Sequence, residues 1–311
     1  MICLGIDTSN YTTSVALYDS ETRQYDSERK LLSVPEGGLG LRQSDAVFQH
    51  TVQLPQLTET LFTRNRRCPD VISVSVRPSE EEGSYMPCFL TGHAVARSLG
   101  SAMQIPVYSF SHQAGHIAAA LFSAQEEKLL THPFYAFHLS GGTTDVLFVE
   151  PDPVNVIRIT KIGGSLDLKA GQAIDRVGKM LGLPFPAGKA LDALSCCSNK
   201  TYHCRPYFKD GSCSFSGVEN QCREMQQKGE LPEDIANYCL TYICTAIEIL
   251  TASIMNNNDS LPLVYSGGVS ANSMLRQRLS AKYHAVFANN GLASDNAVGI
   301  AWLGSLKQKE L

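Results

Sequence analysis

The chain has 311 residues, 43% of them hydrophobic, and this length favours two lobes of about 150 residues each. Its net charge of -4 and its pI near 6.1 argue against a protein that wraps nucleic acid by bulk electrostatics, because phosphate contacts need clustered Lys and Arg. The start MICLGID predicts a strand and not a charged leader, and we expect no apolar stretch long enough to span a bilayer. These features predict a cytoplasmic protein that has no membrane partner.

The first part of the chain alternates between strand and helix patterns. Residues 2–6 and 14–18 are apolar runs on either side of the polar Asp7-Thr8-Ser9, which predicts a hairpin. Further patterns predict strands at residues 71–76 and 107–110, and helices at residues 87–99 and 112–122. We expect these elements to form a first lobe over residues 1–130.

The same order begins again after residue 130. Strands are predicted at residues 134–139, 146–149, 156–162 and 263–265, and helices at 170–181, 188–195, 234–255, 271–283 and 295–303. Residues 198–217 show neither a helical nor a strand periodicity and are interpreted as a loop. Because a strand, a Gly/Ser/Thr turn and a second strand open both halves, we interpret the chain as a duplicated α/β unit with its second lobe over residues 131–311.

Three turns rich in small polar residues follow apolar strands. Asp7-Thr8-Ser9 suits a metal-bound phosphate, because hydroxyls and backbone amides can approach phosphate oxygens closely, and Asp7 is a candidate catalytic carboxylate. The turn that begins at Ser266 runs into a helix whose amino end would attract phosphate. One such turn is most often an ordinary capped turn, but three together predict a nucleotide site. The predicted nucleotide contacts are Ser140, Gly141, Gly142, Gly267 and Gly268.

Two acids lie at matching positions on neighbouring predicted helices. Asp175 follows Gly171 by about one helical turn, and Asp192 follows Gly188 by the same spacing. Carboxylates placed in this way can accept hydrogen bonds from ribose hydroxyls. The alternative is that both are solvated acids on amphipathic helices.

Two histidines and an aspartate are candidate metal ligands. His112 and His116 are four residues apart on a predicted helix, so their imidazoles project from one face and can bind one metal ion. Asp295, at the start of the last predicted helix, is a third candidate ligand with a possible catalytic role. The alternatives are a structural histidine pair and an aspartate that only caps the helix.

The ten cysteines are scattered and form no CxxC pair, so free and mostly buried thiols are the favoured interpretation. The densest group includes His203 and is the alternative place for a metal ion. It comprises Cys196, Cys197, Cys204, Cys213 and Cys222.

These residues resemble the TsaD threonylcarbamoyltransferases of transfer-RNA modification, known also as the catalytic subunit of KEOPS and formerly as sialoglycoprotein endopeptidases. The resemblance runs the length of the chain and rests on GIDTS, SHQAGH, LSGGTT, IGGSLDLKAGQAIDRVGKMLGLPFPAG, SGGVSANSMLR and SDNAVGIA. It implies an α/β fold of two actin-like (ribonuclease-H-like) lobes of the ASKHA superfold, with nucleotide and metal held between the lobes.

The resemblance also implies an activity and its ligands. Iron or zinc would be held by His112, His116 and Asp295, and the adenosine of ATP or an acyl-adenylate by Asp175, Gly188, Asp192 and Asn272. The implied reaction transfers a threonylcarbamoyl group from threonylcarbamoyl-adenylate to the adenine beside the anticodon of transfer RNA. Some family members have a metal-contacting tyrosine where this chain has His138, which is therefore a further candidate ligand; the alternative is a histidine packed between strands.

Three departures from the family pattern indicate a divergent bacterial paralogue. Asn10-Tyr11-Thr12 replaces an acidic pair, the acidic segment Arg77 to Tyr85 replaces a GPG-type loop, and Thr143 replaces His or Asn. The alternative functions are a nucleotide-binding scaffold that acts with a protein partner or as a homodimer, and carbamoylation of another acceptor. A small-molecule kinase is a third class, but no catalytic base is evident. Peptidase activity is disfavoured because the histidine pair lacks the adjacent Glu of a zinc protease.

Overall fold

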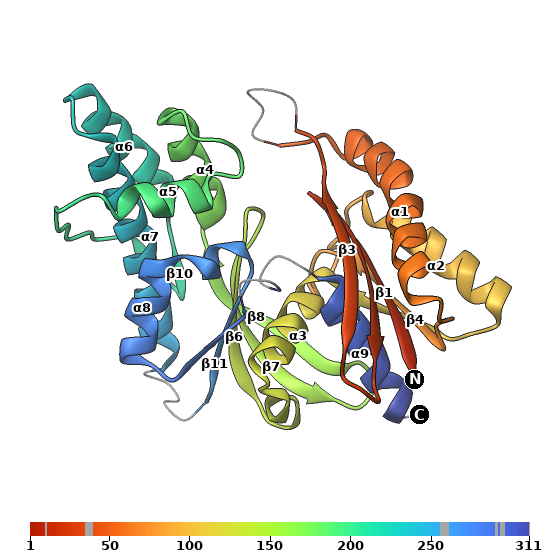
Figure 1. The fold of residues 1–311 in the computed structure, drawn as a ribbon. Coiled ribbons are helices and arrows are strands. Elements are labelled where there is room, and N and C mark those ends of the chain that lie inside the picture. Colours follow the sequence, from red (N-terminus) through yellow and green to blue (C-terminus); the bar gives the residue numbers. More distant parts are fainter. Residues whose placement is uncertain (10, 35–39, 256–260, 290–291, 293–295, 311) are drawn as a thin grey trace. The chain divides into compact units, whose positions relative to one another are not determined.

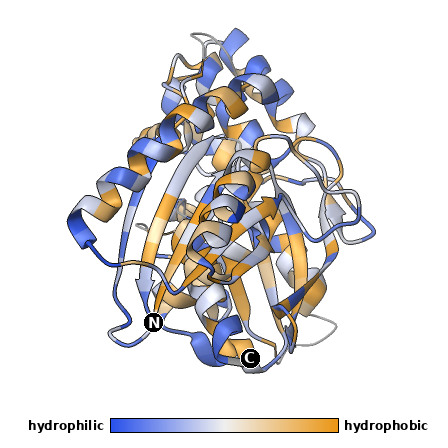
Figure 2. Ribbon diagram, turned by 90° about the vertical axis from the view of Figure 1, so that its right-hand side faces the viewer, coloured by the Kyte–Doolittle hydropathy of each residue, from blue (hydrophilic) through white to orange (hydrophobic). Residues whose placement is uncertain are grey.

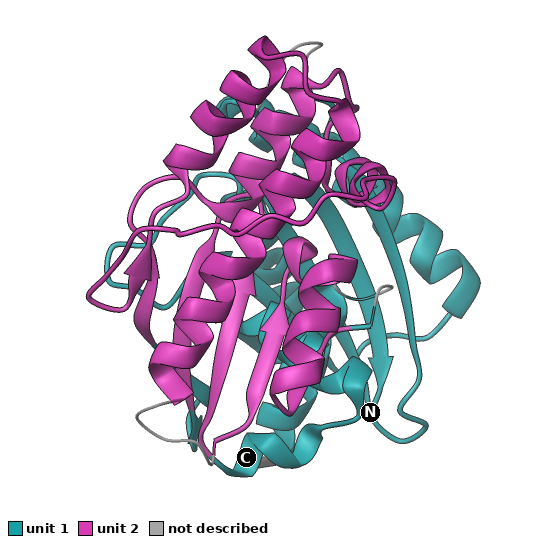
Figure 3. Cartoon of the chain, turned by 90° about the vertical axis from the view of Figure 1, so that its left-hand side faces the viewer, with its two compact units in different colours: residues 1–132, 150–160, 289–311 teal, residues 133–149, 161–288 magenta. Residues whose placement is uncertain are grey.

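The computed structural model describes residues 1–9, 11–34, 40–255, 261–289, 292 and 296–310. The chain divides into two compact units, coloured teal and magenta in Figure 3. Unit 1 comprises residues 1–132, 150–160 and 289–311, and unit 2 comprises residues 133–149 and 161–288.

Unit 1 is built on a five-stranded mixed sheet in the order β3-β2-β1-β4-β5 (Figure 1). The strands are β1 (Ile2–Ser9), β2 (Thr12–Asp19), β3 (Tyr25–Leu31), β4 (Val71–Arg77) and β5 (Val107–Ser111). β2 pairs antiparallel with both β1 and β3, whereas β4 runs parallel to β1 and to β5. Its helices are α1 (Gln43–Asn65), α2 (Phe89–Met103), α3 (His112–Ala124), the short η1 (Glu127–Thr131) and α9 (Ala297–Glu310).

Side chains alternate along β1, and this alternation decides what each face of the sheet carries. Ile2, Leu4 and Ile6 belong to a buried apolar cluster with residues of α1 and α2. The intervening positions face α9 and α3 and are small or polar: a Cβ on Gly5 would lie 2.1 Å from the carbonyl oxygen of Ala297, so only glycine allows α9 to pack this closely. The same alternation places Asp7 on the face covered by α3 and α9.

The end of the chain belongs to unit 1, which differs from the two consecutive lobes expected at residues 1–130 and 131–311. The first boundary, after His132, lies close to the expected one. However, α9 packs on β1, β2, β4 and α3. The crossing with α3 is close, since a Cβ on Gly299 would lie 2.0 Å from the carbonyl oxygen of Gly115. Such packing between distant segments leaves no local signal in the sequence.

Unit 2 contains a seven-stranded sheet in the order β12-β11-β6-β7-β8-β10-β9. The strands are β6 (Phe134–Leu139), β7 (Thr144–Asp152), β8 (Val156–Ser165), β9 (Phe208–Lys209), β10 (Ser212–Cys213), β11 (Leu263–Ser266) and β12 (Ala285–Phe287). β6 and β7 form the second predicted hairpin, and β11 runs parallel to β6. The helices are α4 (Ala170–Met180), α5 (Gly188–Ser195), α6 (Ser216–Gln227), α7 (Pro232–Met255), η2 (Gly268–Ala271) and α8 (Ser273–Lys282).

The helix α7 corrects one expectation from the sequence. Within the described part of the chain, this 24-residue helix is long and apolar enough to cross a membrane by length and composition, although no such segment was expected. Its residues Ile235, Cys239, Ile243 and Ile247 lie in the core of unit 2, packed with residues of α4, α5 and α6. α7 is therefore the central helix of a packed core. Figure 2 shows hydrophobic residues concentrated along the strands, while the helices carry both hydrophilic and hydrophobic residues.

The periodic segments were predicted correctly, and several irregular ones were not. The two hairpins, the strands β4, β5 and β11 and the helices α2, α3, α4, α5 and α7 are confirmed. The long helix α1 and the strand β3 were not predicted, because Pro55 and many polar residues interrupt the helical pattern and β3 is mostly exposed. The segment 198–217, interpreted as a loop, contains β9 and β10 and the start of α6.

Candidate functional site

The two predicted metal ligands on α3 point their ring nitrogens at one another. α3 begins at His112 because Ser111 caps it, with the Ser111 Oγ accepting a hydrogen bond from the backbone N–H of Ala114 at 3.1 Å. His112 and His116 therefore lie one helical turn apart on the same face. Their Nε2 atoms are 3.0 Å apart, and His116 is buried while His112 retains 18% exposure.

Asp7 lies behind His112 and is buried. Its Oδ1 is 3.0 Å from Nδ1 of His112. It also accepts hydrogen bonds from the hydroxyl of Ser75, on the parallel neighbour β4, and from the amide of Asn296 at 3.2 Å. Burial raises the pKa of Asp7, but the charge of His112 and these hydrogen bonds outweigh burial and hold the pKa below its usual range. The carboxylate is thus ionised and fixed against the ring of His112.

The donor set around the histidines fits a transition metal. Metal–nitrogen bonds of about 2.0–2.1 Å that meet near a right angle place two ligand nitrogens about 3 Å apart, as the two Nε2 atoms are here. A carboxylate against the far nitrogen of a ligating histidine is the usual support for such a ligand. Within the described ranges no group of three or more His, Cys, Asp or Glu side chains could hold a metal ion. The third predicted ligand, Asp295, lies outside the described residues.

An acidic loop lies next to the start of α3. It follows β4, and the carbonyl oxygen of Pro78 accepts a hydrogen bond from the backbone N–H of Gln113 at 3.0 Å. Arg77 forms an ion pair with Glu80, while Glu82 is exposed. The backbone of the loop therefore contacts the first turn of α3, beside His112.

In unit 2, the two predicted glycine turns lie side by side at the carboxyl ends of β6 and β11. Gly267 has φ +85°, and a Cβ there would lie 2.4 Å from the carbonyl oxygen of Leu139, so the position requires glycine. The turn after β6 is closed by a hydrogen bond from the N–H of Ser140 to the carbonyl of Thr143 at 2.8 Å. The space above Gly141, Gly142 and Gly268 is open within 4 Å of a Cβ. These backbones can approach a ligand without a clash.

The predicted adenosine contacts come from α4 (Asp175), from α5 (Gly188 and Asp192) and from Asn272, the residue before α8. Asp192 accepts hydrogen bonds from the amide of Asn272 at 2.9 Å and from the backbone N–H of Ser273 at 3.0 Å. Asp175 accepts one from the backbone N–H of Ala187, the residue before Gly188, at 2.8 Å. Burial raises the pKa of Asp175 and that hydrogen bond opposes the rise. Both acids are therefore positioned by their neighbours, and whether they bind ribose stays a prediction.

His138 is buried near the carboxyl end of β6. Asp145 on β7 is directly opposite in the antiparallel register, and Ser266 on β11 is its parallel neighbour. Asp145 forms an ion pair with Lys161 at 3.1 Å. His138 thus shares a face of the sheet with a charged pair, and its role as a metal ligand stays a prediction.

The cysteines predicted to be free carry no disulfide in the described chain. Of the dense group, Cys196 and Cys197 are exposed whereas Cys213 and Cys222 are buried, so its members do not share one environment. Burial raises the pKa of the Cys213 thiol to about 12, so this thiol is protonated at neutral pH.

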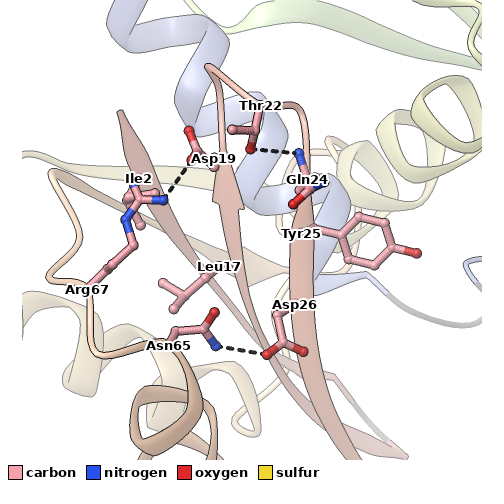
Figure 4. Close-up of a pocket in the computed structure, with 9 residues that line it drawn as sticks. All are labelled: Ile2, Leu17, Asp19, Thr22, Gln24, Tyr25, Asp26, Asn65 and Arg67. Carbon is pink, nitrogen blue, oxygen red and sulfur yellow. Dashed lines mark hydrogen bonds and ion pairs between the residues drawn. The ribbon is translucent and has the colours of Figure 1, made fainter.

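A cavity of about 200 Å³ lies at the other end of β1 from Asp7 (Figure 4). Its polar groups are paired with each other: Arg67 contacts Asp19 at 2.7 Å, and the amide of Asn65 contacts Asp26 at 2.8 Å. It is lined by Ile2 and not by any of the predicted site residues. The cavity is therefore separate from the histidine site.

Ser75 and Asn296 contact Asp7 but were not predicted as site residues. Ser75 could have been suspected, because β4 reads as alternating apolar and small residues and pairs in parallel beside β1. Asn296 follows Asp295 in the SDNA segment, but its direction depends on how α9 packs. Only the fold brings residues 7, 75, 112 and 296 together.

The amino-acid sequence matches known proteins over most of its length. A family model described as TsaD, tRNA N6-adenosine threonylcarbamoyltransferase, matches residues 33–302. A protein named tRNA N6-adenosine threonylcarbamoyltransferase from Buchnera aphidicola is 30% identical over 333 residues, covering 100% of this chain and 94% of that protein. One of the same name from Streptococcus equi subsp. zooepidemicus is 34% identical over 228 residues, covering 68% of this chain and 64% of that protein.

Solved structures share the fold at low sequence identity. Full-length HypF matches with a TM-score of 0.63 and 13% identity, over 99% of this chain and 46% of that chain. Component A of the Acidaminococcus fermentans (R)-2-hydroxyglutaryl-CoA dehydratase matches with a TM-score of 0.57 and 14% identity, over 100% and 99% of the two chains. These likenesses confirm the predicted actin-like ASKHA fold. With the family match over most of its residues, the chain belongs to the TsaD family of tRNA N6-adenosine threonylcarbamoyltransferases, which are acyltransferases.

Proposed function

We propose that this protein transfers a threonylcarbamoyl group from threonylcarbamoyl-adenylate to the adenine beside the anticodon of transfer RNA, with iron or zinc at His112 and His116. The observation that carries the metal part is the 3.0 Å approach of the two Nε2 atoms with the ionised Asp7 behind them. The family membership supports the transferase part. A cytoplasmic location and a protein partner or homodimer belong to the same proposal.

In the proposed mechanism, the residues of unit 1 would hold the metal ligand His112 in position before the substrate binds. Asp7 holds the ring of His112 by its Nδ1, which leaves Nε2 directed at the metal position. Ser75 and Asn296 hold Asp7 in turn, so this side of the site needs little rearrangement. Asp295 is proposed as the third ligand. A bound metal ion would act as a Lewis acid that polarises the carbamoyl carbonyl.

The residues of unit 2 would bind the adenylate. The backbone amides of Gly141, Gly142, Gly267 and Gly268 and the hydroxyl of Ser140 would bind the phosphate, and His138 would be a further metal ligand beside them. Asp175, Asp192, Gly188 and Asn272 would hold the adenosine. The acyl-adenylate is an activated mixed anhydride, and positioning it away from water would suppress hydrolysis.

The acceptor is tested by mass spectrometry of nucleosides. The reaction contains ATP, threonine, bicarbonate, a threonylcarbamoyl-adenylate synthase, unmodified transfer RNA and this protein. We expect threonylcarbamoyladenosine with the unsubstituted protein and none with His116→Ala. If the intermediate is consumed but no modified adenosine forms, transfer RNA is not the acceptor.

A second candidate is carbamoylation of a less anionic acceptor, and the acidic loop favours it. Glu80, Glu81 and Glu82 follow β4 on the loop that bonds to Gln113, next to His112. Carboxylates here repel the phosphates of RNA. A variant with all three glutamates changed to Gln separates the two candidates. Faster modification of transfer RNA would mean that the loop hinders this acceptor. An unchanged rate would remove the argument for a less anionic acceptor.

The proposed adenosine site gives a prediction for Asp175. Asp175→Asn preserves the side-chain shape and the acceptor for the N–H of Ala187 but removes the charge. We expect ATP or an acyl-adenylate analogue to bind about 10-fold more weakly, because a hydrogen bond to a charged group contributes about 1.5–3 kcal/mol. Calorimetry checks this. The control is Asp210→Asn, an exposed acid in the β9–β10 turn; equal affinities for the two variants would remove Asp175 from the site.

A further inference from the structure

Asn296 directly precedes α9 and does not use its side chain as a helix cap. Its carbonyl oxygen accepts the first hydrogen bond of the helix, from the N–H of Ile300 at 3.0 Å, which makes Asn296 the N-cap residue. An asparagine in this position normally accepts a backbone N–H with its Oδ1. Here that Oδ1 is buried and has no hydrogen-bond partner in the part of the chain that the structure describes. The Asn296 side chain therefore lacks the N-cap hydrogen bond that its Oδ1 would otherwise accept from α9.

The amide group of Asn296 is turned toward the histidine site instead. Its Nδ2 lies 2.8 Å from Nδ1 of His112 and 3.2 Å from Oδ1 of Asp7. A carboxylate can only accept, so the amide donates to Asp7 and fixes the oxygen that contacts the ring. The side chain is 2% exposed, so this contact is shielded from water.

Gly115 makes this orientation possible. It lies between the two histidines in α3, and the three atoms nearest to a Cβ at this position would all belong to the amide of Asn296, the closest being Oδ1 at 2.2 Å. Any larger residue would push the amide away from Asp7 and His112. The glycine of SHQAGH and the asparagine of SDNA are therefore spatially complementary, although they are far apart in the sequence.

We propose that Asn296, seated against Gly115, is a positioning residue that holds Asp7 and His112 in the geometry in which His112 binds metal. This inference rests on the metal site of the proposed function and adds two residues to it. Residues that orient a metal ligand in this way typically change metal affinity by about 10–100-fold. A residue that only capped α9 would change stability and leave metal affinity as it was.

The test is a double-mutant cycle on the full chain, with Zn²⁺ affinity measured by chelator competition and the stability of the metal-free protein measured by urea unfolding. We expect Asn296→Ala and Gly115→Ala each to weaken Zn²⁺ binding about 10–100-fold. In the Asn296→Ala background, Gly115→Ala should have almost no further effect, because the amide with which its Cβ clashes is gone. Asn296→Asp, which keeps the shape but removes the donor, should also bind Zn²⁺ weakly.

Asn289→Ala is the matched control. Asn289 is exposed and donates from its amide to the carbonyl oxygen of Ser123, near the other end of α3, at 2.6 Å. This variant should bind Zn²⁺ as the unsubstituted protein does. The inference is overturned if Asn296→Ala binds Zn²⁺ normally, or if Gly115→Ala weakens binding equally in both backgrounds. If the unsubstituted protein binds no Zn²⁺, the proposed metal site itself fails and the inference fails with it.

Discussion

Replacing both His112 and His116 by alanine is expected to reduce bound metal from about one ion per chain to a background level and to abolish adenosine modification. The two Nε2 atoms lie 3.0 Å apart on one face of α3, and the described residues contain no group of three or more His, Cys, Asp or Glu side chains that could hold the ion instead. Loss of two of three or four ligands removes most of the binding free energy of a transition metal. Metal analysis of the purified variants measures this directly.

The single variants distinguish loss of ligands from loss of structure. His112→Ala also removes a partner of the buried Asp7, so we expect it to lower the free energy of unfolding as well. His116→Ala leaves Asp7 untouched and should lose metal with little loss of stability. His132→Ala is the control, because this exposed histidine follows η1 and its ring contacts the hydroxyl of Thr131. Full metal content in the double variant would contradict the assignment.

Removing the carboxylate of Asp7 is expected to have the second largest effect. Asp7→Ala leaves the donors of Ser75, Asn296 and His112 without a buried acceptor. Breaking a buried charged group away from its partners costs about 3–5 kcal/mol, so the urea midpoint should fall strongly. Metal affinity should fall by about 10–100-fold for the same reason, since His112 loses its support.

The pH dependence of stability gives a separate test of Asp7. The pKa of Asp7 in the folded protein lies below the value of about 3.9 of an unfolded chain, so its charge stabilises the fold above that value. This contribution is lost as the pH falls through the folded-state pKa. Asp7→Asn cannot lose it, so the stability of this variant should decline less steeply below about pH 4 than that of the unsubstituted protein. Parallel slopes would mean that Asp7 carries no such charge.

Asp7→Asn also separates a positioning role from a catalytic one. The amide preserves the shape and can still accept a hydrogen bond through its oxygen. If Asp7 acts only through His112, metal affinity and activity should decline together, and excess Zn²⁺ should restore activity. An activity that stays low at saturating Zn²⁺ would support the catalytic role predicted for Asp7 from the sequence.

The sequence alone determined the class of the fold and indicated candidate residues for its site. The apolar runs at residues 2–6 and 14–18 on either side of a polar turn are local and specify a hairpin. The four-residue spacing of His112 and His116 specifies one helix face whatever the helix packs against. Residues at this spacing share a helix face in any tertiary context. The motifs were also sufficient to indicate the family, which the match over residues 33–302 confirms.

Only the tertiary structure decided which distant residues contact Asp7 and to which unit the last helix belongs. Nothing near Asp7 indicates that Asn296 will contact it, because that contact depends on α9 packing against small residues such as Gly5 and Gly115. For the same reason the sequence could not assign α9 to unit 1. α1 was missed because its buried face includes the polar residues His50 and Gln53 and because Pro55 interrupts the pattern, so that burial against β2 and β3 stabilises it more than local propensity does. Contacts between segments far apart in the chain, unlike periodicity within a segment, are set by packing of the whole unit.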